Sequence, residues 1–337
     1  MNRYAAQIAL SEIGEQGQRR LSESKAAVVG CGALGTHAAE LLVRAGVGFL
    51  RILDRDIVDL TNLHRQVLFD ERDARDERPK AEAVEDHLRA INSEVTIESL
   101  VLDFRPANAI EVLSGMDVIL DATDNFEARY LLNDAAVQLG IPWVYGGVTA
   151  TEAMVLPILP GESACLRCLF PDPPVPGSLP TCQTSGVINT GPALAAALQV
   201  TAAIQFLIQG RCPGQDYLHI LDLWSWRSRN VPVARSESCP TCGKRHFDFL
   251  DGQKASRAEV LCGRDSVQVF PPTPVDLDLG AIARRLSETT HAQWQGSLLR
   301  LDMDGHRILL FPDGRMLVRQ TTDTKLARVL YARLVGI

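Results

Sequence analysis

The chain alternates between short apolar runs and helical stretches, and this alternation most constrains its fold. Apolar runs typical of buried strands lie at 25–30, 49–54, 95–103, 116–123 and 142–149. Stretches typical of helices lie between them, at 37–46, 78–92 and 126–140. Strands that alternate with helices build a mainly parallel sheet with helices on both faces. The sequence therefore predicts a doubly wound α/β fold.

A glycine-rich turn follows the first predicted strand. Gly30, Gly32 and Gly35 in "VVGCGALG" fit the pattern G-x-G-x-x-G, between a strand and a helix. Glycines let the backbone approach phosphate oxygens, and the helix start offers free N–H groups. Asp54 ends the next strand, 19 residues after Gly35, where it could bind ribose hydroxyls. This Rossmann-like arrangement suits an NAD-dependent dehydrogenase or an ATP-using enzyme, unless the glycines serve only packing.

The length of 337 residues suits two domains, which we expect at 1–250 and 257–337. Past residue 250 the pattern changes to a small βαβββα unit of α+β type, with Asp-Gly pairs typical of hairpin turns. This unit shows no nucleophile, ligand cluster or phosphate loop, so we expect a non-catalytic role. The proline-rich segment 170–180 is expected to form a loop.

Charge and hydropathy exclude several classes of protein. A net charge of −7 argues against a general nucleic-acid binder. The N-terminal residues lack the pattern of an export signal, so we expect a cytoplasmic protein. The apolar stretch 191–210 contains the polar residues Gln199, Thr201 and Gln205, which favours a buried helix over a membrane span. In one interpretation this helix lies at a subunit interface.

Four of the eight cysteines form two Cys-x-x-Cys pairs, Cys165 with Cys168 and Cys239 with Cys242. Two such pairs in turn-rich sequence predict a closed, structural zinc site with four cysteine ligands, which clamps distant segments together. The alternative is that these cysteines are redox-active or merely buried. Three others, Cys31, Cys212 and Cys262, are expected to be packing residues.

Polar residues follow the second predicted strand. Asn62, Arg65 and Gln66, then Lys80, bring two cations towards the open end of the glycine turn. A triphosphate needs such cations and a dehydrogenase does not, although each residue alone would suit a solvated loop. No Walker-type phosphate loop is present.

Asp124 and Asn125 follow the fourth predicted strand, at the edge where open α/β sheets bind ligands. A carboxylate beside phosphates is best explained by Mg²⁺. Asp124 would also suit the N-cap of the next helix, and the two roles are compatible.

Together these motifs resemble the ThiF/MoeB/HesA family, over residues 3 to about 245. The shared stretches are "RYAAQ", "GCGALG", "ILDRDIVDLTNLHRQ", "PKAEA", "DATDN", "CLRC", "TCQTSGV" and "CPTCG". The resemblance implies a homodimer with one ATP per subunit. Family members adenylate the C-terminal Gly-Gly carboxylate of a ubiquitin-like sulfur-carrier protein and release pyrophosphate.

The resemblance also implies roles for individual residues. Those expected to bind ATP and Mg²⁺ are Gly30, Gly32, Ala33, Gly35, Asp54, Asn62, Arg65, Lys80, Asp124 and Asn125. Those expected to be catalytic are Arg65, Lys80, Asp124 and Cys182. In the ThiF-like branch, a cysteine at the position of Cys182 reacts with the activated carrier; in the MoeB-like branch it is a bystander.

Within the family, these motifs are most like those of ThiF of thiamine thiazole biosynthesis, with a ThiS-like carrier and a sulfur-donor protein as partners. The alternatives are a MoeB-like enzyme acting on a MoaD-like carrier, an NAD-dependent oxidoreductase, and an inactive module that binds ubiquitin-like folds. One departure is Ala6, where the family usually has an arginine that reaches the neighbouring subunit's ATP. Arg3 or the pair Arg19 and Arg20 could replace it, or the rate could be lower.

Overall fold

The computed structural model describes residues 2–173, 186–252, 260–261, 266–271, 275–286 and 292–335. The chain divides into two compact units, Met1–Ala255 and Ser256–Ile337.

The first unit contains an eight-stranded sheet in the order β3-β2-β1-β4-β5-β6-β7-β8. The strands are β1 Lys25–Val29, β2 Phe49–Leu53, β3 Thr96–Leu100, β4 Val118–Asp121, β5 Trp143–Thr149, β6 Glu152–Ile158, β7 Tyr217–Asp222 and β8 Arg227–Pro232. Pairing is parallel from β3 to β5 and antiparallel from β5 to β8. The five parallel strands are those predicted from the sequence, so the doubly wound fold is confirmed.

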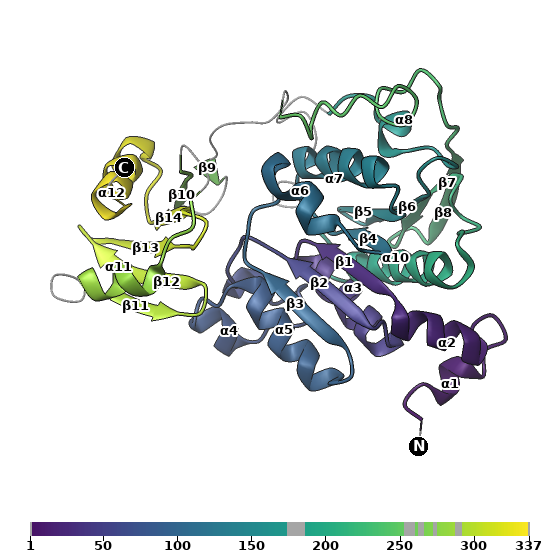
Figure 1. The fold of residues 1–337 in the computed structure, drawn as a ribbon, viewed down its shortest axis with the longest axis horizontal. Helices are drawn as coiled ribbons and strands as arrows, with labels where there is room; N and C mark the ends of the chain where they lie inside the picture. Colours follow the sequence, from purple (N-terminus) through teal and green to yellow (C-terminus); the bar gives the residue numbers. More distant parts are fainter. Residues whose placement is uncertain are drawn as a thin grey trace. The chain divides into compact units, whose positions relative to one another are not determined.

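Helices cover both faces of this sheet (Figure 1). One face carries α3 (Ala33–Ala45), α5 (Lys80–Ile91) and α10 (Thr190–Gln209), and the other carries α6 (Pro106–Leu113) and α7 (Phe126–Leu139). Consecutive residues of β1 alternate between the two apolar cores, because successive side chains of a strand point to opposite faces. Every β1 residue after Lys25 is therefore buried, which explains the continuous apolar run.

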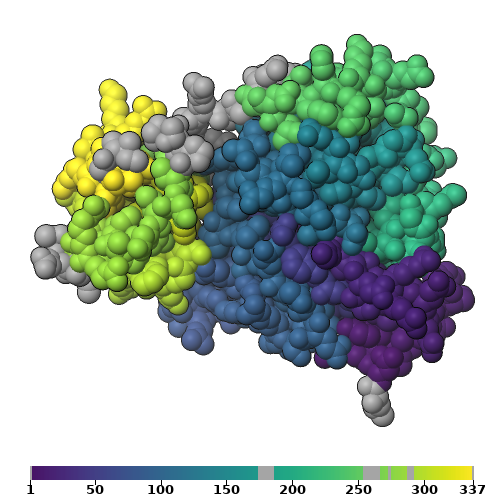
Figure 2. Space-filling view, viewed as in Figure 1, coloured from purple at the N-terminus to yellow at the C-terminus, as the bar shows by residue number. Residues whose placement is uncertain are grey.

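Five short helices complete the described part of this unit: α1 Ala5–Ile8, α2 Gly14–Glu23, the 3₁₀ helix η1 Leu60–Asn62, α4 Glu71–Arg75 and α8 Leu166–Leu169. Figure 2 shows the N-terminal residues, in purple, on the outside of the unit. Among the described residues, α10 alone is long and apolar enough to cross a membrane. It packs against α3, β5 and β6, and more than half of its most apolar window is buried, as in the core helix of a soluble protein.

The sequence did not predict β6, β7 and β8. Every residue of β8 is exposed, so this strand has no apolar alternation to detect. The strand forms through backbone pairing with β7, from Tyr217 opposite Pro232 to Asp222 opposite Arg227.

The second unit is a six-stranded antiparallel sheet in the order β11-β12-β13-β14-β10-β9, with helices α11 and α12. Its elements are β9 Val260–Leu261, β10 Ser266–Val269, α11 Leu279–Leu286, β11 Ala292–Gln295, β12 Leu298–Met303, β13 His306–Leu310, β14 Met316–Arg319 and α12 Thr324–Val335. The predicted βαβββα order is present, with β9 and β11 in addition. Asp304 and Gly305 both have positive φ between β12 and β13, as a type I′ hairpin turn requires.

Candidate functional site

The glycine turn lies at the carboxyl end of β1, between the ends of β2 and β4. The Gly30 N–H donates to the Leu53 carbonyl at 2.8 Å, and the Ala122 N–H donates to the Val29 carbonyl at 2.9 Å. The strand order reverses beside β1, because β2 and β3 lie on one side and β4 and β5 on the other. Open α/β sheets bind ligands at such a switch point.

The three glycines of the turn meet different requirements. Gly30 has φ of +100°, and a Cβ there would lie 2.5 Å from the Ala122 carbonyl oxygen. A Cβ on Gly35 would lie 1.9 Å from the Gly30 carbonyl oxygen, so this glycine allows α3 to pack on the turn. The nearest atom to a Cβ on Gly32 is 4.0 Å away, which leaves open space there. No side chain caps α3, so its first N–H groups are available to an anion.

Asp54 connects the end of β2 to this turn. Its Oδ2 accepts from the Cys31 N–H at 2.6 Å, and its Oδ1 accepts from the Asp56 N–H at 2.7 Å. Burial raises the pKa of Asp54, and the nearby positive charge of Lys80 opposes that rise. The remaining lone pairs of the carboxylate can accept hydrogen bonds from hydroxyl groups of a ligand.

Lys80 is the first residue of α5, and its side chain is only 4% exposed. Its Nζ lies 3.3 Å from Asp56 Oδ2, and its N–H donates to the Asp56 carbonyl at 2.9 Å. The structure thus brings Lys80 to Asp54 and the glycine turn, although 25 residues separate Asp54 from Lys80 along the chain.

The loop between β2 and α4 supplies three more polar side chains. Asn62 is buried, and its Oδ1 accepts from the Asp59 N–H at 3.1 Å, so this amide holds its own loop. Arg65 is half-buried and donates to the Thr61 carbonyl at 3.0 Å. Gln66 is buried beside Gly32, and its Oε1 has no hydrogen-bond partner among the described residues. The Gln66 amide nitrogen is the side-chain atom nearest Gly32, and the same amide group keeps an acceptor oxygen that is unpaired within the described ranges. These two features mark Gln66 as a candidate ligand-binding residue, to which the sequence analysis assigned no role.

Asp124 and Asn125 lie between β4 and α7. The N-cap of α7 is Asn125, whose Oδ1 accepts from the Ala128 N–H at 2.8 Å, so the sequence-based suggestion that Asp124 caps this helix is wrong. The cap residue must have its side chain positioned to receive the N–H groups of the first turn, and Asn125 occupies that position. Asp124 is exposed, and within the described part of the chain its carboxylate has no ion pair or hydrogen bond.

A buried network holds the turn that carries Asp124. Asp121 accepts from the Thr123 N–H at 2.9 Å and lies 3.3 Å from Arg129, which itself donates to the Thr123 carbonyl. The Gln199 amide on α10 donates to the carbonyls of Asp121 and Val144. The sequence analysis assigned no role to Asp121 or Arg129. The available signal was that Asp121 is a charged residue within an apolar strand.

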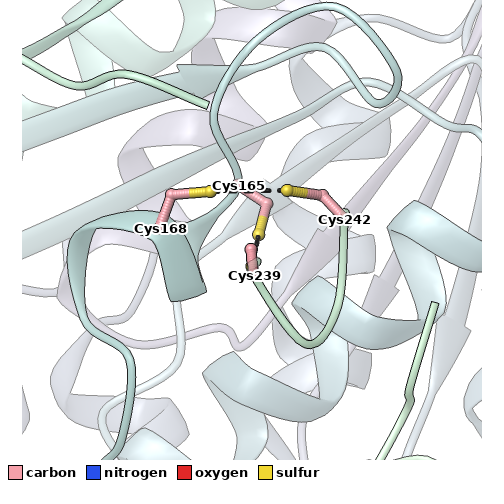
Figure 3. Close-up of side chains that lie close together, drawn as sticks. All are labelled: Cys165, Cys168, Cys239 and Cys242. Carbon is pink, nitrogen blue, oxygen red and sulfur yellow. Dashed lines mark hydrogen bonds between the residues drawn. The ribbon is translucent and has the colours of Figure 1, made fainter. Parts of the chain in front are cut away.

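The four paired cysteines lie together, and their sulfur atoms point toward one another (Figure 3). Their sulfur atoms all lie within 4.8 Å of one another, with Cys165 3.6 Å from Cys239 and Cys168 3.3 Å from Cys242. Hydrogen bonding to Cys165 lowers the pKa of the Cys168 thiol to about 6, and the same contact raises the pKa of Cys165. The cluster can hold a tetrahedral metal ion, because four thiolates converge on one point.

Two sequence-based expectations concern residues outside this arrangement. Cys182 lies outside the described residues. Ala6 is exposed on α1, and two candidate replacements for its missing arginine are engaged within the same chain. Arg3 donates to the Ile91 carbonyl and Arg20 donates to the Ile208 carbonyl.

Comparison with known proteins gives consistent results. The profile of the ThiF family matches residues 4–241. The sulfur carrier protein ThiS adenylyltransferase of Bacillus subtilis is 39% identical over 337 residues, which cover 99% of each chain. A sulfur carrier protein adenylyltransferase of Thermus thermophilus is 39% identical over 248 residues, 72% of this chain and 91% of its own. Among solved structures, E. coli MccB with ATP has a TM-score of 0.61 at 23% identity, over 72% of this chain and 75% of MccB, and this likeness concerns the fold alone.

Proposed function

The chain belongs to the ThiF family, and we propose that it adenylates the C-terminal carboxylate of a small ubiquitin-like sulfur-carrier protein with ATP. The observation that carries this proposal is the match over 99% of both chains to a ThiS adenylyltransferase. The convergence of the glycine turn, Asp54 and Lys80 at the switch point of the sheet supports it.

In the proposed reaction, an oxygen of the carrier's terminal carboxylate attacks the α-phosphorus of ATP. The new acyl–phosphate bond forms as the bond to the bridging oxygen breaks, and pyrophosphate leaves. Both reactants are anionic, so positive charge must offset their repulsion and stabilise the leaving group. Arg65 and Lys80 supply that charge, while the backbone of Gly30, Gly32, Ala33 and Gly35 and the carboxylate of Asp54 hold the nucleotide.

The residues at the end of β4 fit a Mg²⁺ ion bound together with ATP. Asp124 offers an exposed carboxylate without an ion pair among the described residues, and Mg²⁺ is usually held by one or two carboxylates plus phosphate oxygens. When bound, the ion would neutralise phosphate charge. Asn62 and Asn125, whose side chains already fix the local backbone, complete the proposed nucleotide site.

We also propose that Cys165, Cys168, Cys239 and Cys242 bind one structural Zn²⁺. A tetrahedral ion with Zn–S bonds of about 2.3 Å places its sulfur ligands about 3.8 Å apart. The observed sulfur separations of 3.6 and 3.3 Å are close to that value. Four cysteine ligands leave no open position for water, so the ion would stabilise the fold and take no part in the reaction.

The carrier is proposed to be ThiS-like, with a C-terminal Gly-Gly, and the product would receive sulfur from a donor protein for thiamine thiazole formation. We further propose a cytoplasmic homodimer. We propose that the second unit is non-catalytic and serves dimer contacts or carrier docking. The Thermus relative supports this, because nearly its whole length, 91%, aligns with only 72% of this chain. A MoeB-like enzyme would instead activate a MoaD-like carrier.

Carrier-dependent exchange of labelled pyrophosphate into ATP tests the proposal. Exchange is expected with a ThiS-like carrier and not with the same carrier lacking its last two glycines. Exchange with a MoaD-like carrier alone would favour the MoeB-like alternative. Carrier binding without any exchange would contradict the enzymatic function.

A further inference from the structure

Two consecutive residues of α7 each hold one of the two cysteine pairs. Asn133 Oδ1 accepts from the N–H of Leu166, which lies between Cys165 and Cys168, at 3.0 Å. Asp134 Oδ1 accepts from the hydroxyl of Thr241, which lies between Cys239 and Cys242, at 2.8 Å. Both α7 side chains are fully buried. One turn of a helix therefore contacts two segments that are 74 residues apart in the sequence.

Asp134 makes a second contact with the segment that follows the second cysteine pair. Its Oδ2 accepts from the Phe249 N–H at 3.0 Å, and the Phe249 ring packs on Tyr130 of α7 with ring centroids 4.8 Å apart. The two oxygens of one carboxylate thus fix both the turn that carries Cys239 and Cys242 and the chain after it. A second bridge joins the two segments directly, because Arg167 lies 3.1 Å from Asp248.

We propose that Asp134 is a positioning residue of the metal centre, which holds Cys239 and Cys242 at ligand distance from the other pair. This inference rests on the Zn²⁺ site proposed above. A helix orders both segments in the protein itself, so the ion does not have to bring them together. Residues that support metal ligands in this way commonly contribute 10- to 100-fold to metal affinity.

Two substitutions in the full-length protein test this inference. Asp134→Asn replaces one acceptor oxygen with an NH2 group, and Thr241→Val removes the donor at nearly constant volume. We expect each to weaken Zn²⁺ affinity by roughly 10- to 100-fold in competition with a chromogenic chelator. Thr241→Ser keeps the hydroxyl group and should stay within about threefold of the wild-type affinity. At limiting Co²⁺ concentration, the thiolate-to-Co²⁺ absorption of Asp134→Asn and Thr241→Val should be weaker than that of the wild-type protein.

A role in stability alone would give a different result. In that case Asp134→Asn would lower the melting temperature equally with and without chelator, and the affinity for Zn²⁺ would not change. Asn92→Ala serves as the control for a lost buried hydrogen bond, because Asn92 donates to Tyr4 and the Val43 carbonyl.

The possible failures are distinguishable. Wild-type protein purified without metal, and unable to bind Zn²⁺, would overturn the zinc proposal itself. If the wild-type protein binds Zn²⁺ and Thr241→Val binds it with the same affinity, the proposed role of Asp134 is overturned. This comparison holds even if Asp134→Asn fails to fold.

Discussion

The ammonium group of Lys80 lies 3.3 Å from Asp56 and close enough to Asp54 to oppose the rise in the pKa of that carboxyl group. One buried cation thus stands beside two carboxylates at the end of β2. Such a lysine serves the folded state as well as the proposed reaction, because without it two acidic groups would face each other.

Lys80→Met keeps the length of the side chain and removes its charge. We expect pyrophosphate exchange to fall about 100-fold or more. We also expect a loss of about 3 kcal/mol in unfolding free energy at pH 7.5. Burial already raises the pKa of Asp54, and losing Lys80 raises it further. The folded state then prefers the protonated acid, so the stability deficit should shrink as pH falls towards 5. Urea unfolding at both pH values measures this, and a deficit that grows at low pH would contradict it.

Gly35→Ala and Gly32→Ala separate packing from binding within one turn. The Cβ of Gly35→Ala would meet a backbone oxygen at 1.9 Å, so this variant should lose more than about 3 kcal/mol or fail to fold. Gly32→Ala has open space and should melt near wild type but bind ATP at least about tenfold more weakly, since the methyl group would occupy the phosphate approach. Calorimetry and nucleotide titration check both. Normal ATP affinity in Gly32→Ala would place the phosphates elsewhere.

Asp124→Ala tests the proposed Mg²⁺ ligand. Exchange should fall by at least about 100-fold with little change in melting temperature, because the Asp124 side chain is exposed and Asn125 caps α7. Raising the Mg²⁺ concentration should restore part of the rate. Glu111→Ala, which removes an exposed carboxylate from α6, is the matched control. A folded Asp124→Ala protein with the wild-type rate would remove this role.

Arg19 is the expected replacement for the arginine missing at Ala6. The Gln7 and Gln18 side chains hydrogen-bond at 2.7 Å, so Ala6 and Arg19 lie on two short helices, α1 and α2, that pack against each other. Arg19 is exposed, and no partner for its side chain is found within the described residues. Arg19→Ala should lower the exchange rate roughly tenfold, because it removes one charge-assisted contact. Arg44→Ala should leave the exchange rate unchanged. The double variant Ala6→Arg, Arg19→Ala should regain exchange activity. Equal exchange rates for the wild-type protein, Arg19→Ala and the double variant would show that Arg19 does not replace the missing arginine.

Cys182→Ala separates adenylation from sulfur transfer. Adenylation needs no thiol, so pyrophosphate exchange should continue while thiocarboxylate formation on a ThiS-like carrier stops. Mass spectrometry of the carrier measures the product. Cys212→Ala controls for the loss of a thiol, since Cys212 is buried beside Gln205. Unchanged thiocarboxylate production by Cys182→Ala would make this cysteine a bystander, as in the MoeB-like branch.

The sequence by itself determined the parallel half of the sheet, the glycine turn and the two cysteine pairs. Each has a local signal. Strands β1, β4 and β5 are almost wholly buried and therefore read as apolar runs, while the glycines and paired cysteines meet steric and chemical requirements that few other residues satisfy. The Asp-Gly hairpins of the second unit were predictable for the same reason, because their turns need positive φ.

Only the tertiary structure decided how these parts meet. The exposed strand β8 carries no apolar pattern and exists because β7 offers it backbone partners. Asp134 and Thr241, 107 residues apart, hydrogen-bond because α7 and the second cysteine segment pack on the same side of the sheet. Gln66 comes to Gly32 through the folding of a polar loop. Contacts of this kind depend on the packing of whole elements, and the residues adjacent in the chain carry no signal of them.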